Sequence, residues 1–510
     1  MLELRASAEL ELRRRAVTQA PVLDYRTEHQ KKYWNDPVGW ARDCINWKEG
    51  EGPSDYQNDS MAHIPTERRV CIRGPHGIGK SAMAALIVLW FADTRDGQDW
   101  KVATTASAWR QLTKYLWPEI HKWSRRLKWE VLGRKPYVIG KELQTLSLKL
   151  NTGEAFAVAS DQSELIEGAH ADHMLYLFDE SKAIPVSTWD SAEGAFSTGD
   201  CYFFSISTPG EPNGRFYEIQ SHKAGYEDWW SRHVTLEEAI GSGRIKREWA
   251  DARKRQWGES SAVYQNRVLG NFAASDSDGV IPLIYIERAI ERWHQRNDSG
   301  EWGKLTRVSA DIGRGGDPTV LARLHSLAIR EFEETNERTI MPVTGRIKGI
   351  LDANPGAEAV IDVIGIGAGV VDRLREFKSL IGRVLAFNAS SKTTAKDKTQ
   401  ELSFVNDRAW AWWTVRELLQ DDMIDLPPND EMIGDLTAPK YQLMSGGRIQ
   451  IEDKEKIRER IGRSTNYGDA VVMAFWKKSS GPSMEAIEAY GTGTIDEETI
   501  DPDIKAYMES

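Results

Sequence analysis

A glycine-rich segment, set between a short strand pattern and a long apolar helix pattern, constrains the fold of this chain most. Residues 74–81 read GPHGIGKS. Val70 and Ile72 form a short alternating strand pattern before it, and residues 81–93 are strongly apolar after it. Glycines at this spacing let successive backbone N–H groups surround a phosphate, and the following helix directs its positive end at the same group. The pattern predicts a nucleotide-binding loop beside a parallel sheet; the alternative is an ordinary glycine-rich turn.

We expect individual residues of this loop to have separate roles. Lys80 would reach the β- and γ-phosphates, and the hydroxyl of Ser81 would bind Mg²⁺. The residues of this segment that we expect to contact ATP are Gly74, Gly77, Gly79, Lys80, Ser81 and Ala82.

A second apolar strand pattern ends in two acids. Residues 174–178 read MLYLF, and Asp179 and Glu180 follow directly. Asp179 would hold the Mg²⁺ of ATP through water, and Glu180 would orient and polarise the attacking water. Residues 201–206 form a third strand pattern. Thr208 in the turn after it would sense the γ-phosphate, although composition alone favours a simple turn there.

Three further acids each lie in an apolar pattern. Asp311 and Asp362 are each carried near the end of a strand pattern, and Asp469 lies on a helix pattern that is apolar nearly all round. A buried carboxylate is costly unless it is paired or binds metal. Acids from two adjacent strands and a packing helix can converge, and converging carboxylates hold Mg²⁺ or Mn²⁺. Two such ions would activate water and stabilise the leaving oxygen in phosphodiester cleavage.

Other interpretations of these positions stay open. Asp311 and Asp362 would each suit a turn cap, and Asp469 would suit an ion pair with Arg463. The glycines within residues 365–369 suggest a dinucleotide loop, although their spacing is not the GxGxxG of that motif.

The composition limits where nucleic acid can bind. The net charge is −11, so contacts to DNA must come from local basic clusters such as residues 122–128 and 244–255, whose alternative is a solvated helix face. The three cysteines are far apart, which argues against a disulfide framework or a structural zinc site. No apolar run has the length of a membrane span, and the charged first residues lack a signal core, so we expect neither membrane insertion nor secretion.

Taken together, these motifs resemble the large terminase subunits of tailed bacteriophages, over about residues 35–478. Five more segments carry the resemblance: residues 54–57 (SDYQ), 101–105 (KVATT) with Gln111, 166–168 (IEG), 207–209 (STP) and 265–272 (QNRVLGNF).

The resemblance implies roles for individual residues. Tyr56 and Gln57 would belong to the adenine-binding segment, and Thr208 would lie in the motif that couples ATP hydrolysis to movement. The family's nuclease has an RNase H-like fold with three metal-binding acids. These acids map onto Asp311, Asp362 and Asp469.

Two positions depart from the family pattern. Asp317 is an extra acid in the loop after the first nuclease strand, and Gly468 stands where many relatives carry another acid. Both leave the ligand set open. The family also donates an arginine to a neighbour's ATP site, and the sequence does not distinguish among Arg110, Arg125, Arg126 and Arg134.

We therefore expect an α/β protein in which a P-loop NTPase of the ASCE type, with a parallel sheet and a helical lid, precedes an RNase H-like nuclease. Residues 297–300, which read NDSG, would link the two. The expected divisions are an N-terminal helical segment at 1–50, the ATPase core at 51–210, the lid and linker at 211–296, the nuclease at 297–480 and an acidic flexible tail at 481–510.

The resemblance implies that ATP hydrolysis drives double-stranded viral DNA into a procapsid and that a two-metal endonuclease cuts the concatemeric genome. The implied cofactors are ATP, Mg²⁺ at the ATPase site, and two Mg²⁺ or Mn²⁺ ions at the nuclease site. The implied partners are the portal protein, the small terminase subunit and further copies of the chain in a ring of five. The implied location is the host cytoplasm and, transiently, the portal vertex. A helicase fused to a nuclease and a non-catalytic assembly protein are the alternatives; the single ATPase core and the intact acids argue against them.

Overall fold

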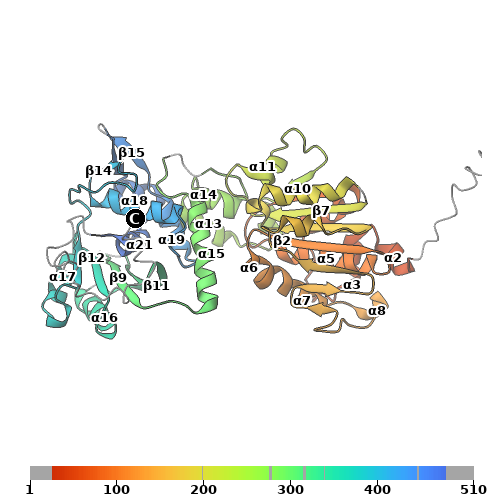
Figure 1. The fold of residues 1–510 in the computed structure, drawn as a ribbon, viewed down its shortest axis with the longest axis horizontal. Coiled ribbons are helices and arrows are strands. Elements are labelled where there is room, and N and C mark those ends of the chain that lie inside the picture. Colours follow the sequence, from red (N-terminus) through yellow and green to blue (C-terminus); the bar gives the residue numbers. More distant parts are fainter. Residues whose placement is uncertain are drawn as a thin grey trace, which may run out of the picture. The chain divides into compact units, whose positions relative to one another are not determined.

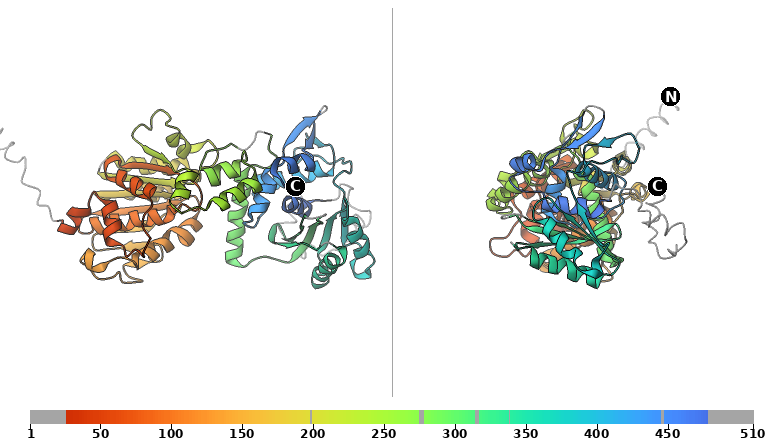
Figure 2. Two further views of the ribbon diagram at one scale, coloured as in Figure 1. Left: turned by 180° about the vertical axis from the view of Figure 1, so that it is seen from behind. Right: turned by 90° about the vertical axis from the view of Figure 1, so that its left-hand side faces the viewer.

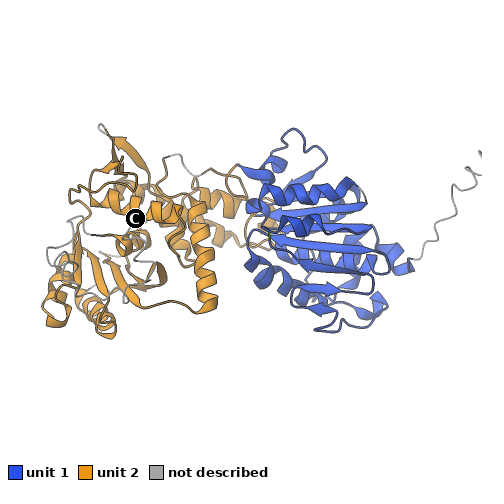
Figure 3. Ribbon diagram, in the orientation of Figure 1, with its two compact units in different colours: residues 1–73, 79–207, 213–233 blue, residues 74–78, 208–212, 234–510 orange. Residues whose placement is uncertain are grey.

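The computed structural model describes residues 26–477, apart from 198, 275–277, 314–316, 338 and 445–446. The predicted tail and the glycines at 315 and 316 therefore lie outside the described residues. The chain forms two compact units (Figure 3). The first comprises Met1–Arg73, Gly79–Ser207 and Asn213–His233, and the second comprises Gly74–Ile78, Thr208–Pro212 and Val234–Ser510.

The first unit is built on an eight-stranded sheet in the order β3-β4-β5-β2-β6-β7-β1-β8 (Figure 1). The six strands from β5 to β8 are parallel, and β3 and β4 add an antiparallel edge. The strands are β1 (Arg69–Arg73), β2 (Trp100–Ala106), β3 (Leu143–Gln144), β4 (Ser147–Lys149), β5 (Gly153–Ala157), β6 (His173–Asp179), β7 (Asp200–Ser207) and β8 (Trp230–His233).

Helices cover this sheet, and its central strands are buried along nearly their whole length. Helix α5 packs against β2 and β6 and is buried on nearly every side, and α4 packs against β1 and β7 (Figures 1 and 2). The helices of the first unit are α2 (Glu28–Tyr33), α3 (Pro37–Cys44), α4 (Asp55–Glu67), α5 (Lys80–Arg95), α6 (Trp109–Gln111), α7 (Trp117–Ser124), α8 (Trp129–Leu132), α9 (Ser163–Glu167), α10 (Val186–Gly194) and α11 (Gly214–Gln220).

The second unit contains a five-stranded sheet in the order β11-β10-β9-β12-β13. The first three strands are antiparallel, and β9, β12 and β13 are parallel, which is the strand arrangement of an RNase H-like fold. A smaller sheet has the order β14-β16-β15. The strands are β9 (Leu305–Asp311), β10 (Thr319–His325), β11 (Ala328–Thr335), β12 (Glu358–Asp362), β13 (Val384–Phe387), β14 (Ser403–Phe404), β15 (Tyr441–Met444) and β16 (Arg448–Ile451).

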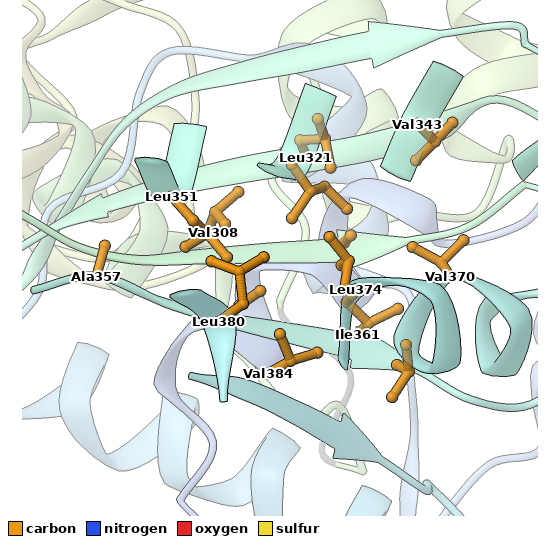
Figure 4. Packing of buried hydrophobic residues seen from close by; sticks show 14 of the residues in the cluster. Val308, Leu321, Val343, Leu351, Ala357, Ile361, Val370, Leu374, Leu380 and Val384 are labelled. Carbon is orange, nitrogen blue, oxygen red and sulfur yellow. The ribbon is translucent and has the colours of Figure 1, made fainter. Parts of the chain in front are cut away.

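Alternation along β9 separates the two faces of the larger sheet. Val308 and Ala310 enter an apolar core with α16 and α17 (Figure 4), whereas Ser309 donates from the other face to the carbonyl of Ala470 in α21 at 2.6 Å. Asp311 shares the parity of Ser309. The helices of the second unit are α12 (Leu236–Gly241), α13 (Arg247–Trp257), α14 (Ala262–Tyr264), α15 (Leu283–Ser299), α16 (Ile340–Ala353), α17 (Gly367–Arg375), α18 (Asp407–Gln420), α19 (Asp430–Thr437), α20 (Lys454–Ile461) and α21 (Asn466–Phe475).

One detail of the predicted organisation is wrong. Residues 297–299 form the last turn of α15 rather than a linker, because Arg292 and Arg296 of this helix both pair with Asp425 and the helix ends only at Gly300, whose φ is +75°. The region after residue 210 is mainly helical, and its strand β8 forms an edge of the first sheet. Among the described residues, no helix has the length and apolarity needed to cross a membrane.

The apolar core in Figure 4 supports a stability prediction. We expect Leu351→Ala to lower the free energy of unfolding by about 2–5 kcal/mol, because Leu351 is fully buried and its removal leaves a cavity. Ile381→Ala, at a side chain that is 71% exposed, should change it by less than about 0.5 kcal/mol. Urea melts of the full chain would compare the two variants, and equal midpoints would contradict the assignment of this core.

Candidate nucleotide and metal sites

The glycine-rich loop connects β1 to α5, as the sequence predicts. Gly77 and Gly79 have φ of +79° and +90°, a backbone region that favours glycine. Gly74 is small for another reason: a Cβ there would lie 2.7 Å from Cδ1 of Ile78 and 3.0 Å from Cβ of Val234. Glycine at these three positions thus has two steric reasons, positive φ at Gly77 and Gly79 and close neighbours at Gly74, which is typical of a loop whose backbone shape matters.

The segment before the loop contacts the loop backbone. The side-chain amide of Gln57 donates to the carbonyl of Gly79 at 2.9 Å, while its Oε1 accepts from the backbone N–H of Ser54 at 2.9 Å. Tyr56 is buried. The amide of Gln57 therefore holds the end of the loop, a contact that the sequence does not reveal.

Four polar residues gather where α5 begins and β6 ends. The hydroxyl of Ser81 donates to Oδ2 of Asp179 at 3.4 Å. Burial lowers the pKa of the Lys80 ammonium, and the charges of Glu180 and Asp179 oppose that shift. Burial raises the pKa of Asp179 to about 7, and the neighbouring charge of Glu180 acts in the same direction. A cation held between Ser81 and Asp179 would relieve this carboxylate, so the donor set suits Mg²⁺.

Glu180 is held by the neighbouring strand. Its backbone has φ of +46°, and its Oε2 accepts from the hydroxyl of Ser207 at 3.2 Å. Since β6 and β7 are adjacent and parallel, their last residues meet at one edge of the sheet. Sequence reasoning singled out Thr208 and missed the contact of Ser207.

Two other predicted ATP-binding residues are placed as follows. Thr208 is fully buried and belongs to the second unit, and Ala82 lies in the first turn of α5.

The second unit brings the three other acids into electrostatic contact. Asp311 ends β9 and Asp362 ends the adjacent parallel strand β12, where Ala310 and Ile361 are in register. Asp469 lies in the first turn of α21, which packs on β9. The charges of Asp469 and Asp362 both act on Asp311.

A lysine joins two of these acids. The ammonium of Lys454, the first residue of α20, lies 3.2 Å from Oδ2 of Asp311 and 2.9 Å from Oδ2 of Asp469. Its side chain is 37% exposed. Among the described residues, no three histidine, cysteine, aspartate or glutamate side chains are grouped closely enough to hold a metal ion as they stand. Two of the three acids thus share a cation that the protein itself supplies.

The pKa shifts follow from this arrangement. Burial raises the pKa of Asp311 to about 7 and raises that of Asp362. Burial acts on Asp469 as well, but Lys454 and Arg408 together hold its pKa below the ordinary value. Burial would lower the pKa of Lys454, yet Asp469 and Asp311 raise it. Carboxylate oxygens with this much negative charge are suitable ligands for Mg²⁺ or Mn²⁺, and the ammonium of Lys454 takes the place of such a cation.

The contacts of Asp469, Asp317 and Asp362 agree only in part with those expected from the sequence. Arg463 pairs with Asp435 and not with Asp469, so the proposed Asp469–Arg463 ion pair is wrong. Asp317 lies 3.5 Å from Nη1 of Arg458. Asp362 accepts from the backbone N–H of Ile364 at 2.9 Å, as a turn cap would.

Many residues of the basic clusters are paired within the chain. Their ion pairs favour the interpretation of these segments as solvated helix faces. The pairs are Lys122–Glu119, Arg126–Glu51, Arg247–Glu237, Arg253–Asp430 and Lys254–Glu259.

Comparisons with known proteins point in one direction. No family model matches the chain. A protein of Enterobacteria phage P7, described as "Probable terminase, large subunit", is 21% identical over 429 residues, which cover 78% of this chain and 83% of that protein.

Solved structures give weaker likenesses. The nuclease domain of the large terminase subunit gp2 of bacterial virus Sf6 matches with 18% identity and a TM-score of 0.33, over 38% of this chain and 97% of that one. The large terminase of a thermophilic bacteriophage matches with 15% identity and a TM-score of 0.37, over 86% of this chain and 98% of that one. The fold assignment rests on the strand orders of this chain itself. In its motifs, and over 78% of its length, the chain is similar to a protein described as the probable large terminase subunit of a phage.

Proposed function

We propose that the chain is a DNA-packaging motor that hydrolyses ATP to move double-stranded viral DNA into a procapsid and cuts the concatemeric genome with its own nuclease. The observation that carries this proposal is the presence of two acid-centred sites in separate units of one chain. One contains Lys80, Asp179 and Glu180, and the other contains Asp311 and Asp469 around Lys454.

At the first site, the loop and the start of α5 would bind the phosphates of ATP. Lys80 would contact the β- and γ-phosphates, and Ser81 with Asp179 would hold Mg²⁺. Glu180, fixed by the hydroxyl of Ser207, would orient the attacking water and accept its proton. Gln57 would transmit the presence of adenine to the loop backbone through Gly79. Thr208 would report loss of the γ-phosphate.

At the second site, Asp311, Asp362 and Asp469 would hold two Mg²⁺ or Mn²⁺ ions. Bound there, such ions activate water and stabilise the leaving oxygen of a phosphodiester. The chain's own contribution would be to hold these carboxylates near one another. Lys454 supports this by lying between Asp311 and Asp469.

We further propose the organisation and partners of this machine. The ATPase core would span residues 51–210, the lid 211–296 and the nuclease 297–480, with helical and acidic segments at the ends. Portal protein, small terminase subunit and a ring of five copies would complete the motor, which would work in the host cytoplasm at the portal vertex.

The two activities should separate by mutation. Lys80→Ala and Glu180→Gln should each lower DNA-stimulated ATP hydrolysis at least about 100-fold, because each removes a group that acts on the phosphate or on the water. Mn²⁺-dependent plasmid cutting by the same proteins should persist. Asp469→Ala should abolish plasmid cutting and leave ATP hydrolysis unchanged. Lys149→Ala, at an exposed lysine of the first unit, should change neither ATP hydrolysis nor plasmid cutting. Loss of both activities in the Lys80→Ala and Asp469→Ala proteins alike would contradict separate sites.

Lys454 offers a test of metal binding that does not depend on catalysis. In the presence of EDTA, Lys454→Ala should melt a few degrees below wild type, since the variant loses the counter-ion that Asp311 and Asp469 share. Mn²⁺ should restore the variant more than it stabilises wild type, because the ammonium no longer competes for the same oxygens.

The control for this experiment is Lys398→Ala, which removes a half-exposed lysine paired with Asp421. It should respond to Mn²⁺ as wild type does. An equal Mn²⁺ shift in all three proteins would show that Lys454 and the metal do not share ligands.

A further inference from the structure

The helix that carries Asp469 has an unusual N-terminus. Its N-cap residue, Thr465, does not cap it; the Thr465 hydroxyl donates instead to Oδ2 of Asp469 at 2.8 Å. The first N–H groups of a helix need acceptors, and a buried helix end cannot obtain them from water. Another part of the chain must therefore supply the cap.

Asp435 of α19 supplies it. The side chain is fully buried, and its Oδ2 accepts from the backbone N–H groups of Tyr467 at 2.9 Å and Gly468 at 3.1 Å. These are N–H groups of the first turn of α21. A carboxylate also suits the positive end of the helix. Because Asp435 takes over the capping, the hydroxyl of Thr465 can hold Asp469.

Gly468 makes this contact possible. A Cβ at position 468 would lie 2.9 Å from Cβ of Asp435 and 3.1 Å from the ring of Trp412, so α19 approaches the helix too closely for a side chain there. The close approach of α19 therefore leaves room only for glycine at position 468.

A single arginine fixes Asp435 in turn. Nη1 of Arg463 pairs with Oδ1 of Asp435. Its Nε donates to the carbonyl of Gln256 in α13 at 3.1 Å, and its Nη2 donates to the carbonyl of Glu431 in α19 at 3.2 Å. Trp257 of α13 adds a hydrogen bond from its Nε1 to the carbonyl of Asp430 at 2.9 Å. The cap of α21 is therefore anchored to α13, a helix of the segment that precedes the nuclease sheet.

We infer that Asp435 is a positioning residue for the metal site: together with Arg463, it sets the place of Asp469 by capping α21 from α19 and tying both helices to α13. The inference rests on the proposed nuclease function and adds to it a residue that touches neither metal nor DNA. Groups that orient a metal ligand typically change metal affinity or activity about 10–100-fold when they are lost.

The test compares full-length variants in Mn²⁺ titrations. Asp435→Asn keeps the size of the side chain but loses its charge, and Gly468→Ala keeps every charge while forcing α19 and α21 apart. Both should raise the Mn²⁺ concentration for half-maximal plasmid cutting at least about tenfold, with cutting restored at high Mn²⁺. Mn²⁺ binding measured by electron paramagnetic resonance should shift in parallel, and ATP hydrolysis should stay within about twofold of wild type.

The matched control is Asp425→Asn. Asp425 is also a buried carboxylate of the second unit, but its ion pairs are with Arg292 and Arg296 of α15. A purely structural role of Asp435 would give the result expected for this control: lower stability and less active protein, with an unchanged Mn²⁺ midpoint.

The outcomes separate the inference from the proposed function. An unshifted Mn²⁺ midpoint in both Asp435→Asn and Gly468→Ala would overturn the positioning role, and if the first variant fails to fold, the second decides alone. Wild-type protein that binds Mn²⁺ without cutting DNA would count against the nuclease only, and the binding midpoints would still decide the inference. Absence of Mn²⁺ binding by wild type would overturn both.

Discussion

The second unit is organised by the ammonium of Lys454, which two buried carboxylates share. Asp311 and Asp469 come from a strand and a helix that lie far apart in the sequence, and each would be costly to bury alone. The elements around this contact place Asp311, Asp469 and Lys454 close together. Strands β9 and β12 end side by side, α21 crosses the same face of the sheet, and α20 begins at the lysine.

The first unit also combines acids at a strand end with a buried lysine. Its acids, Asp179 and Glu180, also stand at the end of a parallel strand, and Lys80 is the buried cation near them. In each unit the lysine is the first residue of a helix. The difference lies in the loop before it. Lys80 directly follows Gly79, whose φ is +90°, whereas Lys454 comes shortly after the end of β16.

Much of this could be predicted from the sequence, because apolar runs that end in acids or glycines specify strands and their functional ends. The strands before Asp179, Asp311 and Asp362 and the helix of Asp469 are confirmed by the structure. The fold class is confirmed as well. The roles of the site residues remain predictions, since the structure places the side chains without ligands or chemistry.

What the sequence could not reveal depends on packing between distant segments. Lys454 lies in a charged stretch and Asp435 in a short, largely apolar one, and only the folded chain brings them to Asp469 and to its helix. The sequence does not distinguish the role of Ser207 from that of Thr208, because both are residue types common in turns. The segment at 297–300 has turn composition, but ion pairs of Arg292 and Arg296 with Asp425 keep α15 helical there.

If Asp311, Asp362 and Asp469 form one divalent-metal site whose place Lys454 takes, crystals of the full chain soaked in Mn²⁺ should show anomalous diffraction peaks within coordination distance of these carboxylates. The ammonium of Lys454 should then be displaced from between Asp311 and Asp469. Lys454 remaining between the two acids at saturating Mn²⁺, with no peak beside any of the three, would contradict this metal site.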